Sequence, residues 1–179
     1  LCHGSYSSAG AKETAELMAA IQYLKTRGID EVGVWGFSMG GAVALMTAPE
    51  APEIKAITSE ASYARLDLMA RELYRLPLLN YPLAELTMLW AKLFLKIDIR
   101  KVAPAEMVKN LRIPILIIHS TNDDVIPFRH ALLLQDALKD NPRSDFWFQE
   151  NLIHPVTASS NGVHGQFSET YQKKIEEFF

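Results

Sequence analysis

Short runs of consecutive apolar residues alternate along the chain with longer segments whose apolar residues recur at helical spacing. The run 32–37 and the β-branched run 113–119 are typical of strands that are covered on both faces of a sheet. In 12–27 the residues Leu17, Ile21 and Leu24 share one helical face, and Gly28 follows as a C-terminal cap. By these criteria the predicted strands are 32–37, 54–59, 113–119 and 146–148, and the predicted helices are 12–27, 39–48, 127–139 and 167–179.

This alternation predicts an α/β fold, in which helices flank a mostly parallel sheet with right-handed crossovers. The composition agrees with that class. A chain of 179 residues that is 49% hydrophobic and 22% charged is long enough for one globular domain and has no bias towards disorder. We therefore expect one domain, interrupted by an insertion between the second and third strands.

The sequence GFSMGG at 36–41 lies where the first predicted strand gives way to a helix. A G-x-S-x-G pattern in this context is typical of a sharp turn that holds a nucleophilic serine at its apex. Gly36 and Gly40 are expected to be needed because a Cβ at either position would clash where the strand and the helix cross. Gly41 is expected to let the helix pack closely. Ser38 is the predicted nucleophile; the alternative is a glycine-rich turn with an incidental serine.

Charge and cysteine content narrow the class of protein. The net charge is −3 and the Lys and Arg residues are scattered, so we expect no nucleic-acid partner. The longest uncharged apolar run near the middle, 76–84, contains two prolines and is too short to span a bilayer, so we expect no transmembrane segment. Cys2 is the only cysteine, which excludes an intramolecular disulfide and favours a reducing, cytoplasmic location.

Three features together resemble the α/β-hydrolase superfamily: the turn at 36–41, the stretch IIHSTNDDVIP at 117–127, and a late His164 before the terminal helix. The most similar branch contains the dienelactone hydrolases and the catalytic domain of prolyl oligopeptidases. HGSYS at 3–7 resembles the turn after the fourth strand in these proteins. The resemblance implies that the first three strands, most of the fourth and any signal peptide lie upstream, which leaves one edge of the strand ending at Phe37 unpaired.

The resemblance implies a triad in the chain order serine, acid, histidine. Asp123 is the expected acid because it lies four residues beyond His119, where the family's H-G-x-x-D pattern places it, although Ser120 replaces the usual glycine. Asp124 is the alternative acid, and its structural interpretation is a carboxylate in a turn. Glu60, which also follows a strand, is a weaker alternative.

The general base implied by the resemblance is a histidine in the loop after the last strand, and two residues qualify. His164 is favoured because Gly162 and Gly165 flank it and the terminal helix follows directly. His154 stays an alternative because the loop 150–162 is longer than usual for the family. None of the five histidines has the spacing of a metal-ligand set, so we expect no metal and no cofactor.

The oxyanion of a tetrahedral intermediate needs two amide donors. The N–H of Met39, in the first turn of the helix after Ser38, is the first predicted donor and gains from the helix dipole. The resemblance places the second donor in a loop upstream of Leu1. Because losing one donor costs about a hundredfold in rate, we expect this chain by itself to be a poor catalyst.

The insertion is rich in Leu, Met and aromatic residues. By the resemblance, 62–102 is a helical cap over the serine, while 1–61 and 103–179 form the hydrolase core. We expect two or three short helices that are broken at Pro77 and Pro82. The apolar side chains form either an acyl-binding wall or ordinary contacts with the sheet or with a second copy of the chain.

These features together predict a serine hydrolase, and more specifically a carboxylesterase. Ser38 would cleave a small-molecule ester, with a preference for apolar acyl groups, through an acyl-enzyme that water releases. Peptidase, thioesterase and acyltransferase activities use the same groups and stay open. A non-catalytic binding protein that keeps the fold is an alternative from another class, and a homo-oligomer fits the apolar insertion.

Overall fold

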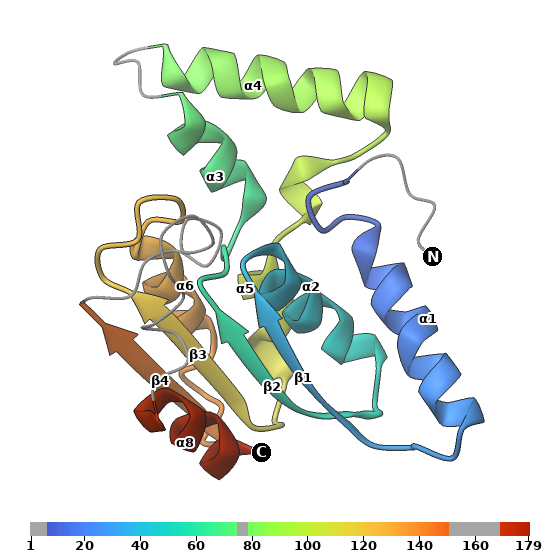
Figure 1. Cartoon of the computed structure of the whole chain (residues 1–179). Coiled ribbons are helices and arrows are strands. Elements are labelled where there is room, and N and C mark those ends of the chain that lie inside the picture. The colour runs from blue at the N-terminus through green and yellow to red at the C-terminus, as the bar shows by residue number, and fades with distance from the viewer. Residues whose placement is uncertain (1–6, 75–78, 151–168) are drawn as a thin grey trace.

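Four parallel strands form the centre of the molecule in this computed structural model, which describes residues 7–74, 79–150 and 169–179 (Figure 1). The sheet order is β1-β2-β3-β4, with β1 (Val32–Phe37), β2 (Ile54–Glu60), β3 (Ile115–Ser120) and β4 (Ser144–Gln149). Each strand overlaps its predicted range, and all neighbouring pairs are parallel. The predicted strands and their direction are therefore confirmed.

Helices cover both faces of this sheet (Figure 1). Ile115 and Ile117 of β3 belong to the core cluster that contains residues of α1, α2, α5 and α6, whereas Leu116 and Ile118 pack with Tyr171 of α8. Successive side chains of a strand point to opposite faces, so a continuous apolar run is needed to fill both cores. The helices and helical turns that cover the sheet are α1 (Glu13–Thr26), α2 (Met39–Thr47), η1 (Ala48–Glu50), α5 (Pro104–Met107), η4 (Val108–Asn110), α6 (Arg129–Ala137) and α8 (Glu169–Phe178).

β1 and β4 are the edge strands of the sheet within the described part of the chain. The expectation that β1 has one unpaired edge agrees with this order. Among the described residues, the helices are all too short or too polar to cross a bilayer.

The insertion between β2 and β3 is helical, as predicted. It contains α3 (Leu66–Leu73), α4 (Asn80–Trp90), the π-helical turn η2 (Ala91–Leu95) and the 3-10 turn η3 (Ile99–Lys101). Figure 1 shows α3 rising from the carboxyl end of β2 and α4 crossing above it. The predicted break at Pro82 is wrong, because Pro82 lies in the first turn of α4, where backbone N–H groups have no intrahelical acceptor. Pro77 lies outside the described residues.

His130 of α6 joins the core to the inserted helices. Its ring is fully buried, Nδ1 accepts a hydrogen bond from Ala64 N–H at 3.1 Å, and Nε2 lies 3.0 Å from the Glu72 carboxylate of α3. Glu72 also forms an ion pair with Arg129. Burial lowers the pKa of His130 below its ordinary value, although Glu72 opposes this shift. Nothing in the sequence pattern indicates this link, because Ala64 and Glu72 are more than 50 positions away from His130 in the chain.

The lowered pKa of His130 predicts a pH-dependent stability. Below pH 6.5 the unfolded chain protonates this histidine while the folded chain resists, so the free energy of unfolding falls as the pH drops. The contribution is at most about 1.4 kcal/mol per pH unit. We expect His130→Asn, whose amide oxygen can replace Nδ1 as the acceptor, to be less stable at pH 7.5 but to lose less stability between pH 7.5 and 5.5. Denaturant unfolding at both pH values measures this, and parallel pH curves would contradict it.

Candidate active site

Ser38 occupies the turn between β1 and α2 in a backbone conformation that non-glycine residues rarely adopt, with φ 51° and ψ −120°. Its N–H donates to the carbonyl of Glu60 at 2.8 Å, and its carbonyl accepts the first bond of α2 from Ala42 at 3.2 Å. These bonds hold the turn at the end of the sheet. Strained positions of this kind cluster at functional sites, and the conformation matches the sharp turn predicted from the sequence.

The glycines around Ser38 differ in what they permit. A Cβ on Gly36 would lie 2.5 Å from the backbone carbon and oxygen of Gly40, and one on Gly41 would lie 2.6 Å from Ser59 Oγ and 2.9 Å from the Gly36 oxygen. A Cβ on Gly40 would meet no heavy atom of the described residues within 4 Å. Gly36 therefore has the steric role that was predicted for it. The prediction that a Cβ on Gly40 would clash is wrong, because the close contact is between residue 36 and the backbone of Gly40, and the Cβ position of Gly40 does not take part in it.

This difference predicts that two similar substitutions change the free energy of unfolding by very different amounts. Gly36→Ala is expected to lower the free energy of unfolding by about 3 kcal/mol, since its methyl group would overlap backbone atoms that cannot rotate away. Gly40→Ala places a better helix former in the first turn of α2 and is expected to stay within about 1 kcal/mol of the unmodified protein. Chemical denaturation measures both. Equal losses in the two variants would contradict this account of the turn.

The predicted nucleophile and the predicted acid both lie just beyond the carboxyl ends of strands of the sheet. Glu60, the last residue of β2, pairs with Phe37, the last residue of β1, and with Ile118 of β3, which continues to Ser120, so the carboxyl ends of these strands lie on the same side of the sheet. Ser38 directly follows β1, and Asp123 lies three residues beyond β3. Binding sites in open α/β sheets lie outside the carboxyl ends of the strands.

The side chain of Asp123 is buried, and its orientation is fixed by the loop that carries it. Oδ1 accepts hydrogen bonds from the N–H groups of Val125 at 2.9 Å and Ile126 at 2.8 Å. Oδ2 lies 3.8 Å from Nε2 of His119, and this nitrogen is 2.9 Å from the Ile126 carbonyl. Asp124, in contrast, is exposed in the turn. A buried and oriented carboxylate is what a triad acid requires, which favours Asp123 over Asp124.

Glu60, the weaker acid candidate, lies on the face of the sheet that α8 covers. Its side chain is 2% exposed and accepts a hydrogen bond from the hydroxyl of Tyr171, 111 positions later in the chain. Burial and the neighbouring Glu60 raise the pKa of Tyr171 far above its usual range. Nothing in the sequence indicates that Tyr171 contacts Glu60, because only the fold brings these two residues together.

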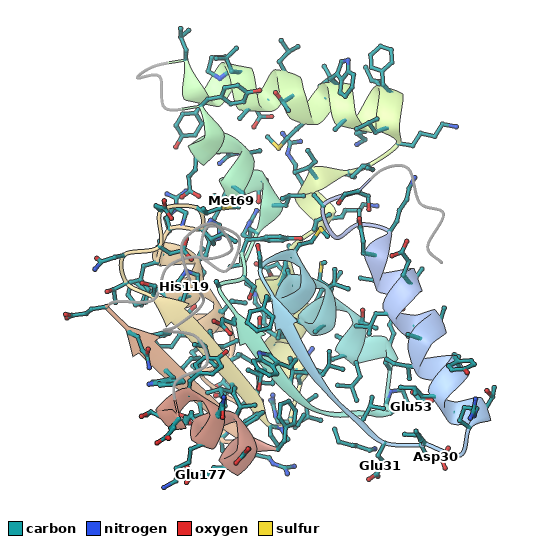
Figure 2. The ribbon with its side chains drawn as sticks, viewed as in Figure 1. Asp30, Glu31, Glu53, Met69, His119 and Glu177 are labelled. Atoms are coloured by element: carbon teal, nitrogen blue, oxygen red, sulfur yellow. The ribbon has the colours of Figure 1, made fainter. Side chains whose placement is uncertain are left out.

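Met39, whose N–H is the predicted oxyanion donor, begins α2 next to Ser38. First-turn N–H groups of a helix have no intrahelical acceptor, so this amide can serve a ligand. The Met39 side chain packs with Leu66 and Met69 of α3 against a cluster that includes Val43 and Ile126. Figure 2 shows Met69 where α3 meets the core, above the end of the sheet where His119 lies. The base of the insertion thus packs on the same apolar cluster as the residue that follows Ser38.

The two histidines proposed as general base, His154 and His164, lie outside the described residues, and so does His3. In the chain, His154 and His164 follow β4, whose carboxyl end lies on the same side of the sheet as those of β1 and β3. Which of the two serves as base stays a prediction. Within the described ranges, no group of three or more His, Cys, Asp or Glu side chains is placed to hold a metal ion.

Fold and turn together define the class of protein: this is an α/β-hydrolase fold with a serine in the turn that follows strand β1. Comparison with family profiles is more specific. The profile of the prolyl oligopeptidase family, Peptidase_S9, matches residues 3–169, and the chain belongs to this family. The resemblance stated from the sequence motifs is therefore confirmed.

Individual relatives are more distant and longer. YqkD of Bacillus subtilis (strain 168), described as an uncharacterized protein, is 29% identical over 185 residues that cover 98% of this chain and 57% of YqkD. The Pyrococcus furiosus esterase Pf2001 matches with a TM-score of 0.71 and 21% identity, over 98% of this chain and 64% of that chain. A Pyrococcus horikoshii acylaminoacyl peptidase gives a TM-score of 0.69 and 19% identity, over 95% and 28%. The chain spans less than two thirds of the length of each.

Proposed function

We propose that the protein is a serine hydrolase in which Ser38 is the nucleophile, Asp123 the acid and His164 the general base. The observation that carries this proposal is the conformation of Ser38, held with positive φ in the turn between β1 and α2. Membership of the prolyl oligopeptidase family supports it, as do structural neighbours named as esterases and peptidases.

The proposed reaction follows the acyl-enzyme route. Ser38 Oγ attacks the substrate carbonyl while His164 takes its proton, and the N–H of Met39 donates to the oxyanion that forms. As the leaving group departs, His164 returns the proton to it. Water then enters, gives a proton to His164 and attacks the acyl-enzyme, and the acid product leaves as Ser38 regains its proton. Asp123 holds the imidazole in one tautomer and stabilises its cationic form.

We infer a carboxylic ester with an apolar acyl group as the substrate. Met39, which follows Ser38, packs against the same apolar cluster as Leu66 and Met69 of α3, and apolar surroundings of this kind suit an acyl chain better than a charged group. A peptide substrate is the second candidate, because the family is named for prolyl oligopeptidase and one structural neighbour is an acylaminoacyl peptidase. The same catalytic groups serve both reactions, so substrate selection depends on the pocket and not on the triad.

Reaction of the intact protein with a fluorophosphonate tests the proposal. Labelling is expected on Ser38 and can be located by peptide mass spectrometry. Rates with p-nitrophenyl esters of increasing chain length, compared with p-nitroanilides of the same acyl groups, then separate ester from peptide-like substrates. A folded protein whose Ser38 does not react would contradict the proposal and favour a non-catalytic binding protein.

A further inference from the structure

The inserted helix α4 presents large apolar side chains away from the molecule (Figure 2). Residues that are three or four positions apart lie on one face of a helix. By that spacing α4 and the turn η2 carry a continuous outer face, with Phe94 69% and Leu93 64% exposed. We call this the α4 face, and its exposed members are Leu86, Leu89, Trp90, Leu93 and Phe94.

The α4 face reverses the usual arrangement of an amphipathic helix. The buried side chains of this segment are Ala84, Met88 and Ala91, so mainly small residues contact the molecule and large ones face outward. Surface helices normally direct their large apolar residues to the core. A contiguous apolar patch of this kind marks a binding surface in a folded protein.

The polar contacts of α4 lie on its other side, where they attach the helix to α3. Thr87 bonds to the hydroxyl of Tyr74 at 2.5 Å, and Glu85 bonds to Arg71 at 3.3 Å. The helix is thereby held in place with its apolar face outward, and the α4 face itself contains no charged residue.

Cationic side chains border the α4 face. A groove of about 560 Å³ beside it has Leu86 and Leu89 on its walls, together with the cations Lys92 and Arg100 and the carboxylates Glu85 and Asp98. Lys92 pairs with Asp98 at 3.3 Å and Arg100 pairs with Glu85. Over 79–101 there are four Lys or Arg residues and two carboxylates, a net charge of +2, whereas the whole chain has −3. This segment is therefore a cationic and apolar region of an otherwise acidic chain.

We propose that the α4 face binds the surface of an anionic lipid assembly. Its residue types, with Trp90 and Phe94 among leucines and lysines at the border, are those of helices that lie in a membrane interface. The positive border matches the negative surface of anionic lipids and gives a reason to prefer lipid over a second copy, whose border would carry the same charge. This inference goes beyond the proposed hydrolase activity and does not depend on it, because binding needs no turnover.

Co-sedimentation of the intact protein with vesicles tests this inference. We expect binding to vesicles of phosphatidylglycerol and phosphatidylcholine, at least about tenfold weaker binding to phosphatidylcholine alone, and a loss of binding at high salt. Trp90→Ser/Phe94→Ser is expected to weaken binding by about tenfold or more, because both rings leave the interface. The matched control is Tyr23→Ser/Leu132→Ser, which removes apolar side chains of comparable exposure from α1 and α6 and should leave binding unchanged.

The charge contribution has its own pair of variants. Lys92→Gln/Lys96→Gln is expected to reduce the preference for anionic vesicles by about tenfold, whereas Lys139→Gln/Lys173→Gln, which neutralises exposed lysines elsewhere, should not. Fluorophosphonate labelling of the same samples reports the state of Ser38 separately, so a failure of lipid binding is distinct from a failure of catalysis.

Three results would overturn the inference. They are no sedimentation with any vesicle, equal loss of binding in the α4 variant and its control, and a stable dimer in sedimentation velocity that only the α4 variant dissociates. The last result would assign the α4 face to a second copy of the chain.

Discussion

Ser38→Ala is expected to reduce kcat/KM for esters by about a millionfold and to abolish labelling by fluorophosphonates, because no other group at the turn can form the acyl-enzyme. The free energy of unfolding should change little, since alanine keeps the Cβ and the positive φ of residue 38. Steady-state hydrolysis with a chromogenic ester measures the first effect, and denaturant unfolding measures the second.

A serine at the opposite end of the sheet provides the control for this substitution. Ser144 begins β4, and its hydroxyl donates to the carbonyl of Asn141 at 2.7 Å. Ser144→Ala should lose about 1 kcal/mol of stability with that bond and keep its turnover. If Ser38→Ala retained hydrolysis while folded, the nucleophile would have to be elsewhere and the proposed mechanism would be wrong.

Asp123→Asn is expected to reduce kcat by about 10⁴-fold, because an amide cannot stabilise the imidazolium or hold the imidazole in the required tautomer. The substitution is nearly isosteric. An asparagine oxygen in place of Oδ1 can still accept the N–H groups of Val125 and Ile126, so the loop should keep its shape. Steady-state kinetics, with thermal unfolding to confirm that the variant is folded, measures the effect.

The neighbouring carboxylate is the matched control. Asp124 is exposed in the same turn, so Asp124→Asn should keep kcat within about threefold of the unmodified protein, in line with the small effects of most surface substitutions. A large loss in Asp124→Asn with activity retained in Asp123→Asn would reverse the assignment. Activity retained in both would direct attention to Glu60.

Local sequence was sufficient to predict the elements that position the site. Gly28 ends α1 with φ 79°, as its place after the apolar period indicated, and the strand boundaries of β1 agree with the prediction. The turn at Ser38 was also predictable, because the small residues it needs lie within six consecutive positions. Such features depend on sterics between neighbours in the chain, and these are visible in the sequence.

Two other predictions were wrong because the effect of a proline or a glycine depends on its exact position in the helix or the turn. Pro82 was expected to break a helix, but it lies in a first turn that tolerates proline. Gly40 was expected to avoid a clash, but its α-hydrogens face open space among the described residues. In both cases the residue type was noted correctly, while its position relative to a helix start or a packed neighbour was not available from the pattern.

The sequence by itself determined the α/β class, the strained serine turn and the family, since each rests on residues that are adjacent or regularly spaced. Only the tertiary structure decided that Asp123 is buried while Asp124 is exposed, that Tyr171 bonds to Glu60, and that α4 turns its large side chains outward. The reason is physical. Helical spacing marks which residues share a face, but which face is buried depends on contacts between segments that are far apart in the chain.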